Sequence, residues 1–152
     1  MFFSKPQLDI IRYCSAEISR QHDEPHTVVY LIEAWQYAMM EYAEHKFTGV
    51  TINFILRLGK ISHPYKNADG FRKVNVTVGD RKCPPASEVQ WRMQKLIEEQ
   101  RGFAPDQFYF AFETIHPFLD GNGRVGKILY NFLHGTLHDP QLPPNFWGTE
   151  NP

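Results

Sequence analysis

Apolar residues recur at helical spacing over most of this chain, and that period limits its fold more than any other feature. It is found in residues 6–20, 26–45, 51–61, 87–100, 104–116 and 122–138. One stretch departs from it, because Phe71 to Val78 alternates apolar and polar residues before the turn residues Gly79 and Asp80. The sequence therefore predicts a mostly α-helical bundle with one short β-hairpin.

The length and the apolar content fit one domain, 1–152. The chain has 152 residues, 42% of them hydrophobic, and a chain of this size buries roughly 70% of its unfolded surface. Segment 26–45 is apolar on several sides, at Leu31 and Trp35 among others, so we expect this helix to run through the core. Residues 139–152 are rich in Pro, and we expect an irregular tail there.

Charge and cysteine content narrow the choice of partners and compartment. The net charge is −1, so nothing global attracts the chain to nucleic acid or to an anionic membrane. The N-terminus lacks the long apolar run of a signal peptide or a transmembrane helix. Cys14 and Cys83 have no metal-type spacing. We therefore expect a reduced cytoplasmic protein, with secretion into a host by a non-classical route left open.

Segment 116–127 concentrates polar groups that suit a nucleotide's phosphates. Gly121, Asn122 and Gly123 lie where a loop enters a helix, and backbone N–H groups at such a place form an anion site. Asp120 directly precedes this turn. We expect it to hold Mg²⁺, which prefers one or two carboxylates together with substrate phosphates.

Other polar side chains nearby fit the same chemistry. Arg124, Lys127 and Asn131 lie at i, i+3 and i+7 of the following helix, away from its apolar stripe, so all three can point at what the loop holds. His116 ends the preceding helical segment, and the ordinary histidine pKa of about 6.5 suits a general base. These residues predict a site that binds phosphates and activates a hydroxyl against one of them.

Two common nucleotide-binding patterns overlap this segment and fail on context. Gly121, Gly123 and Gly126 satisfy G-x-G-x-x-G, and the first and last of them also match the glycines of a P-loop. Both motifs need a preceding β-strand, whereas residues 104–116 have helical periodicity. Ile128 also stands where a P-loop has Ser or Thr to bind Mg²⁺.

The same residues closely resemble the signature of the Fic family, H-x-F-x-[DE]-G-N-G-R-x-x-R. The matching positions are His116, Phe118, Asp120, Gly121, Asn122, Gly123 and Arg124. Lys127 departs from the signature, since the family usually has a second Arg there. The resemblance covers about residues 48–138 and includes Asn131, where many members carry an Asn.

The resemblance implies a Fic-type helical domain that transfers AMP from ATP to a Ser, Thr or Tyr hydroxyl of a target protein and releases pyrophosphate. It implies that His116 deprotonates the hydroxyl and that Asp120 holds Mg²⁺ against the α- and β-phosphates. Residues 121–123 would cradle the phosphates, and Arg124 would stabilise the leaving pyrophosphate. Lys127 keeps a charge for the γ-phosphate but lacks the bidentate geometry of Arg. We therefore expect activity with ATP that is reduced but not abolished, or a preference for a nucleotide whose γ-phosphate matters less.

A segment upstream of the signature looks like the family's flap hairpin. Its residues are Phe71, Arg72, Lys73, Val74, Asn75 and Val76. An exposed hairpin edge can pair with an extended segment of another protein through main-chain hydrogen bonds. We therefore expect these residues to dock the target near His116.

Many Fic proteins are restrained by a helix with the pattern [ST]-x-x-x-E-[GN], and no full match occurs here. Residues 19–24 have Asp23 where the Glu belongs, and Phe146 occupies the Ser or Thr position before Glu150. We expect either a separate antitoxin-like partner or no intramolecular restraint.

Two alternatives to AMP transfer remain open. One is a Fic-fold enzyme that moves another phosphate-containing group, such as a different nucleotide or a phosphate. The intact glycines at 121 and 123 favour AMP transfer over this, because kinase-like relatives usually carry a degenerate glycine loop. The other is a nucleotide-binding or partner-binding module that has lost catalysis through Lys127.

Overall fold

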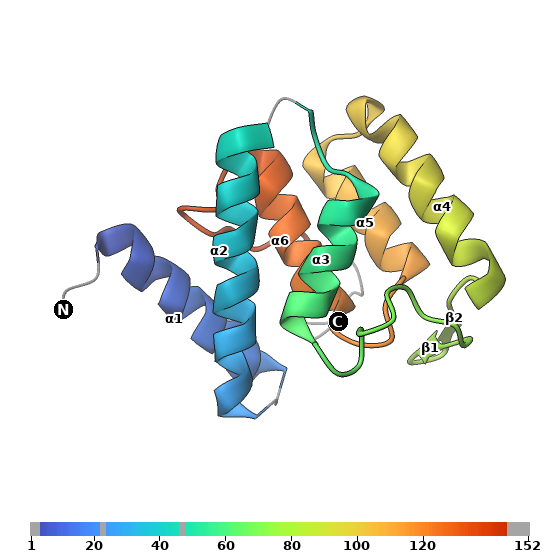
Figure 1. Cartoon of the computed structure of the whole chain (residues 1–152), viewed down its shortest axis with the longest axis horizontal. Helices are drawn as coiled ribbons and strands as arrows, with labels where there is room; N and C mark the ends of the chain where they lie inside the picture. Colours follow the sequence, from blue (N-terminus) through green and yellow to red (C-terminus); the bar gives the residue numbers. More distant parts are fainter. Residues whose placement is uncertain (1–3, 22–23, 46–47, 146–152) are drawn as a thin grey trace.

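The chain folds into a bundle of α-helices with a small β-hairpin at one end (Figure 1). The computed structural model describes residues 4–21, 24–45 and 48–145. The α-helices are α1 (Lys5–Arg20), α2 (Val28–His45), α3 (Ile52–Ser62), α4 (Ala86–Glu99), α5 (Pro105–Ile115) and α6 (Asn122–His134), and two 3-10 turns are η1 (Pro25–Thr27) and η2 (Gln100–Gly102). Strands β1 (Thr77–Val78) and β2 (Arg81–Lys82) form the hairpin. The predicted fold class, mostly α with one short hairpin, is confirmed.

The most buried helix is α6, whereas segment 26–45, which we expected to run through the core, is buried on one face only. Figure 1 shows α6 between α2 and α5, behind α3, and it contacts all three. Even Lys127 and Arg124 on α6 are buried. Helix α2 buries Leu31 and Trp35 but leaves Val29 and Met40 more than half exposed. Helix α2 therefore contributes one face to the core, and its remaining apolar residues lie partly on the surface.

Local signals set several of the helix ends. Ser4 caps α1, where its hydroxyl accepts the N–H of Gln7 at 3.4 Å and its own N–H donates to the Gln7 side chain at 2.7 Å. Thr51 caps α3 by accepting the N–H of Phe54 at 3.1 Å. Gly135 ends α6 with a φ of 75°, so the helix stops at His134 and not at the predicted residue 138.

The hairpin is shorter than the alternating pattern predicted. Thr77 pairs with Lys82 and Val78 with Arg81, on either side of the turn at Gly79. Residues 71–76 lie before the strands and belong to neither of them. The β pattern was read too far upstream, because its apolar residues serve different purposes along the segment.

The residues before the hairpin hold neighbouring elements together. The Phe71 ring packs 5.3 Å from that of Phe118, centroid to centroid. Arg72 is 4% exposed and donates to the carbonyls of Ile115 at 3.1 Å and His116 at 2.7 Å. The Asn75 side chain accepts the N–H of Ala86 at 2.8 Å, so it caps the start of α4.

The chain after α6 is irregular as far as the structure describes it, through residue 145, in agreement with the expected tail. The rest of that tail, with Phe146 and Glu150, lies outside the described residues, as does Asp23. Each helix in the described part of the chain is too short or too polar to traverse a lipid bilayer.

Gly59 on α3 is required by the ring that anchors the loop before α6. A Cβ built at Gly59 lies 2.3 Å from the fully buried ring of Phe118. This overlap outweighs the roughly 1 kcal/mol that alanine gains over glycine within a helix. We predict that Gly59→Ala lowers the free energy of unfolding by about 1–3 kcal/mol, measured by urea denaturation.

Gly102→Ala is the matched control, because nothing lies within 4 Å of a Cβ at that position. We expect its free energy of unfolding to stay within about 0.5 kcal/mol of the wild type. Equal stability of the two variants would show that Phe118 moves aside at no cost.

Candidate active site

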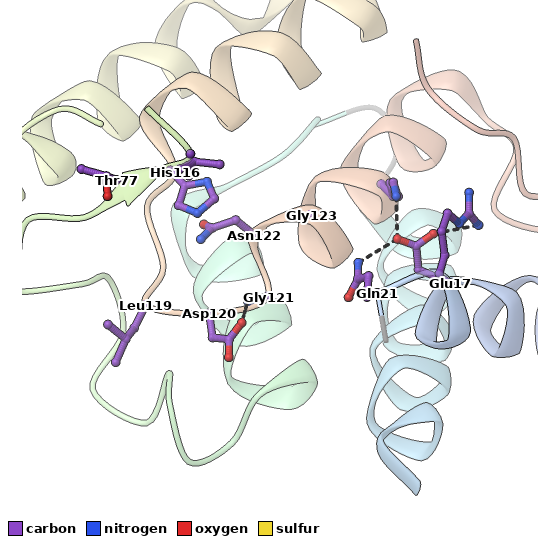
Figure 2. Close-up of a pocket in the computed structure, with 13 residues that line it drawn as sticks. Glu17, Gln21, Thr77, His116, Leu119, Asp120, Gly121, Asn122 and Gly123 are labelled. Carbon is purple, nitrogen blue, oxygen red and sulfur yellow. Dashed lines mark hydrogen bonds and ion pairs between the residues drawn. The ribbon is translucent and has the colours of Figure 1, made fainter. Parts of the chain in front are cut away.

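A cavity of about 490 Å³ lies where the end of α1, the hairpin and the loop before α6 meet. Its walls include Glu17, Thr77, His116 and Asp120, which come from widely separated parts of the sequence (Figure 2). The structure thus brings together most of the predicted phosphate-handling residues. It also adds residues of α1 that the sequence did not single out.

The loop before α6 is fixed from inside by Asn122. This side chain is buried, accepts the N–H of Phe118 at 2.8 Å and donates to the carbonyl of the same residue at 2.9 Å. Its amide group therefore shapes the loop, and what Asn122 offers the cavity is its backbone. Phe118 is fully buried, as expected of an anchor.

The start of α6 has the geometry of an anion site. Gly121 is the N-terminal cap and has a φ of 76°, a region that side chains disfavour. Its Cα faces the His63 ring, which would lie 2.3 Å from a Cβ. A Cβ on Gly123 would meet nothing closer than 3.7 Å, so this residue faces open space at the cavity. The first N–H groups of an α-helix have no acceptor within the helix and can donate to phosphate oxygens.

Asp120 presents a half-exposed carboxylate beside this helix start. Its side chain is 55% exposed, and Oδ1 accepts the N–H of Gly121 at 2.8 Å. Among the residues that the structure describes, no group of three or more His, Cys, Asp or Glu is placed to hold a metal ion. The donor set fits Mg²⁺ all the same, because this ion is commonly held by one carboxylate together with substrate phosphates and water.

Two residues of the 63–70 turn position Asp120, and the sequence did not reveal them. Asn67 is buried; its side-chain amide donates to the Asp120 carbonyl at 2.8 Å and its side-chain oxygen accepts the Asp120 N–H at 3.4 Å. His63 Nε2 lies 4.0 Å from Asp120 Oδ1 and 3.3 Å from Arg124 Nη1. The sequence marks Asn67 only as a turn residue, since its partner lies 53 positions away.

His116 has an unusual backbone and a lowered pKa. It ends α5 in the left-handed region, with a φ of 52°, a conformation that costs a non-glycine residue about 1–2 kcal/mol. Its carbonyl accepts the Arg72 Nε–H at 2.7 Å, which holds it there. Burial lowers the pKa of its imidazole to about 4, and the charges of Arg72 and Arg81 act in the same direction. The ring is therefore neutral at pH 7, the state in which it can accept a proton.

The last turn of α1 binds Lys127. The Nζ atom of Lys127 lies 2.5 Å from Glu17 Oε1, and both side chains are buried. Arg20 Nη2 lies 3.0 Å from the other oxygen of the same carboxylate. Glu17, which is labelled in Figure 2, therefore sits between two cations in the cavity wall.

Gln21, the residue that directly follows α1, binds the other cation of the signature. Arg124 donates from Nε to the side-chain oxygen of Gln21 at 2.8 Å, and the Gln21 amide donates to Glu17 at 2.8 Å. Arg124 is buried and is engaged on its other side by His63. Both signature cations are thus in contact with α1 or its C-cap, so they do not simply project into open solvent.

Asn131 does not face the cavity, contrary to the prediction. It is fully buried, and its side-chain oxygen accepts from the Thr136 hydroxyl and the Gln141 N–H, each at 2.7 Å. Its amide donates to the carbonyls of Lys127 at 2.8 Å and Gln141 at 3.0 Å. Asn131 therefore ties the segment after α6 back onto the helix.

The predicted docking residues also need correction. Phe71 and Arg72 are buried, so they cannot face a bound target segment, and Asn75 is engaged as the cap of α4. Lys73 and Val74 are exposed and Val76 is half-buried, but these three do not line the cavity. The hairpin residues that do line it are Thr77, Val78 and Gly79.

Two proteins of known family are similar in sequence to about half of this chain or less. The chain is 31% identical over 77 residues to a Fido domain-containing protein of Dictyostelium discoideum, covering 43% of this chain and 54% of that one. It is 37% identical over 75 residues to a probable protein adenylyltransferase of Aquifex aeolicus, covering 42% of this chain and 23% of that one. The match thus spans about half or less of these relatives' own lengths.

Two solved structures share the fold. A Fic domain containing signaling protein from Bacteroides thetaiotaomicron superposes with a TM-score of 0.60 at 18% identity, covering 74% of this chain and 47% of that one. Fic-1 from C. elegans superposes with a TM-score of 0.64 at 16% identity, covering 94% of this chain and 55% of that one. Residues 49–134, more than half of the chain, match the sequence profile of the Fic/DOC family. The chain belongs to that family.

Proposed function

We propose that this protein transfers AMP from ATP to a Ser, Thr or Tyr hydroxyl of a target protein. The observation that carries the proposal is that a neutral imidazole, a half-exposed carboxylate and a helix N-terminus face one cavity. These are a base for the hydroxyl, a ligand for a phosphate-bound Mg²⁺ and a site for the phosphates. The relative in Aquifex aeolicus named as a probable adenylyltransferase supports the same reaction.

In this mechanism the target hydroxyl gives its proton to the His116 imidazole as its oxygen attacks the α-phosphorus. The bond between the α-phosphorus and the bridging oxygen breaks, and pyrophosphate leaves with the electron pair. The N–H groups at the start of α6 stabilise the charge that develops on the phosphate oxygens. Arg124 does not line the cavity, because it is buried against Gln21 and His63, so in this proposal it joins the phosphates only after it gives up its bond to Gln21. Asp120 would hold Mg²⁺, which neutralises phosphate charge when bound. The protein contributes positioning and electrostatic stabilisation.

Glu17 restrains this activity in our proposal. Family resemblance assigns the γ-phosphate to the second signature cation, and Glu17 already binds that cation, Lys127, at 2.5 Å. The sequence pattern for such a restraint fails here because Tyr13 and Ile18 replace its first and last positions, yet the carboxylate reaches the expected place. An intramolecular restraint therefore needs no separate antitoxin-like partner, although one can act in addition.

The hairpin contributes the target-binding surface in this proposal. Thr77 and Gly79 are exposed at the cavity, and a target segment laid along β1 would bring its hydroxyl towards His116. The cytoplasm is the compartment that we propose, since Cys14 and Cys83 are buried thiols without a disulfide.

Label transfer from ATP in a cell lysate with Mg²⁺ tests the reaction, with the label on the α-phosphate in one sample and on the γ-phosphate in another. We expect protein bands labelled from the α-phosphate alone, which disappear with His116→Ala. Labelling from the γ-phosphate alone would instead establish a kinase. ATP binding without labelling of any protein would favour a binding module.

The lowered pKa of His116 predicts the pH dependence of the reaction. The base works when neutral, so activity is present above the pKa of about 4 and is lost as the pH falls through it. We expect kcat/KM to stay level from pH 8 down to about 5 and then to fall. Arg81→Gln removes one of the charges that lower this pKa, so it should move the acid limb to higher pH. An acid limb near the ordinary histidine value of about 6.5 in the wild type would contradict the assignment.

Replacing Glu17 should activate the enzyme. Glu17→Gln removes the charge that binds Lys127, and losing a charge-assisted hydrogen bond of about 1.5–3 kcal/mol corresponds to roughly ten- to a hundredfold. We predict an increase of that order in AMP transfer at limiting ATP, measured by label incorporation, with a lower Tm because a buried ion pair is broken.

Asp9→Asn is the matched control, because Asp9 lies on the same helix and pairs only with the exposed Lys5 and Arg12 in the contacts that the structure describes. We expect this variant to retain wild-type transfer. If Glu17→Gln were no more active than Asp9→Asn, Glu17 would be a structural residue and not a restraint.

A further inference from the structure

We propose that Arg20 is a second cation for the terminal phosphate of the nucleoside triphosphate, beside Lys127, and that the Glu17 restraint proposed above therefore holds both cations. Arg20 lies on α1, outside the residues 49–134 that match the family. The inference rests on the proposed function in so far as that function takes a nucleoside triphosphate into this cavity.

The geometry places the two cations on opposite oxygens of one carboxylate. Glu17 Oε1 lies 2.5 Å from Lys127 Nζ, and Glu17 Oε2 lies 3.0 Å from Arg20 Nη2. All three residues line the cavity that holds His116 and the start of α6, and Figure 2 shows Glu17 reaching towards that helix. An oxyanion in the place of this carboxylate would therefore meet both cations at once.

Arg20 supplies the chemistry that Lys127 lacks. A lysine ammonium is a point charge, whereas a guanidinium is planar and can bind two phosphate oxygens side by side. The family's signature usually has its second Arg at the position of Lys127. Here a guanidinium reaches the same carboxylate from the neighbouring helix, so the pair offers a phosphate both a charge and a planar fork.

Charge balance favours a phosphate over Glu17 at this place. A terminal phosphate carries about −1.5 to −2 charges at pH 7, so it nearly balances the two positive charges of Arg20 and Lys127. The single negative charge of a carboxylate balances only one of them. The Glu17 side chain is only 1% exposed and is fixed in the cavity wall, whereas that of Arg20 keeps 27% exposure and can follow an incoming ligand. Glu17 and the terminal phosphate thus compete for one pair of cations.

A purely structural role for Arg20 is the reading to be tested against this one. Arg20 and Glu17 are three residues apart on α1, and an arginine in the last turn of a helix is also favoured by the helix dipole. In that role Arg20 would hold α1 in place and would affect all nucleotides alike. In the proposed role, loss of Arg20 weakens the binding of nucleoside triphosphates and leaves the binding of shorter nucleotides nearly unchanged.

The experiment is calorimetric titration with ATP, ADP and AMP in the presence of Mg²⁺, using the full chain with Glu17→Gln to remove the competing charge. Adding Arg20→Gln should weaken ATP binding by about tenfold or more, the effect of losing a charge-assisted hydrogen bond. Binding of ADP and AMP should change by less than about twofold. Arg20→Lys, which keeps the charge and loses the fork, should fall between the two for ATP.

Arg12→Gln is the matched control, since Arg12 is a 76% exposed cation on the same helix whose described ion pair is with Asp9. It should leave all three affinities unchanged, and circular dichroism should show the same helical content in every variant. Equal weakening of ATP and AMP by Arg20→Gln, or no weakening of either, would overturn the proposal, as would failure of the Glu17→Gln protein to bind ATP.

The label-transfer assay on the same variants separates this inference from the proposed function. An ATP-specific loss of affinity in Arg20→Gln without transfer of AMP to any protein would support the phosphate site and refute AMP transfer. Transfer that survives Arg20→Gln with unaltered ATP affinity would do the reverse.

Discussion

The ion pair between Glu17 and Lys127 joins the first helix of the chain to the last, and the shape of the cavity depends on it. Both side chains are buried, so each charge needs the other, because an isolated charge in such a place would cost several kcal/mol. Gln21, directly after α1, extends the contact to Arg124, so the end of α1 and its C-cap engage both signature cations. This segment is therefore a wall of the cavity that is held by polar bonds, and a ligand of opposite charge can compete for the same bonds.

The loop before α6 is fixed in a different way, by side chains that bond to its backbone. The Asn122 side chain bonds to the backbone of Phe118, and that of Asn67 bonds to the backbone of Asp120. Arg72 donates to the carbonyls at the end of α5. Such bonds remain in place when a ligand enters, since none of them uses a group that a phosphate or a metal ion would need. Rigid placement of this kind reduces the reorganisation that the reaction would otherwise require. The cavity thus has one side, the loop before α6, that is held by bonds to its backbone. The other side, the end of α1, is held by ion pairs for which a charged ligand can compete.

These two kinds of contact explain how far the sequence could predict the molecule. Helix positions, the short hairpin and the 116–124 signature follow from local patterns, because caps, periodicity and turn residues act within a few positions. Asn131 was misassigned since its spacing on α6 matches that of Arg124 and Lys127, while its actual partners lie in the segment that follows. Glu17 was missed because its partner is 110 residues away and nothing in its own surroundings distinguishes it from a surface glutamate.

Lysine at position 127 has two competing partners in our proposal, the Glu17 carboxylate and a terminal phosphate, and its suitability depends on both. An arginine there would bind a terminal phosphate more tightly, but it would also bind Glu17 more tightly, since both are oxyanions that accept a planar fork. A substitution that strengthens two competing states equally shifts neither against the other. The position of the equilibrium depends on the difference between the two anions. Glu17 is a fixed part of the chain with one charge, and the phosphate arrives with a charge nearer two. In the proposed phosphate site, lysine, which responds to charge and not to shape, would favour the phosphate in that comparison, and Arg20 on the neighbouring helix would provide the planar contact that lysine does not.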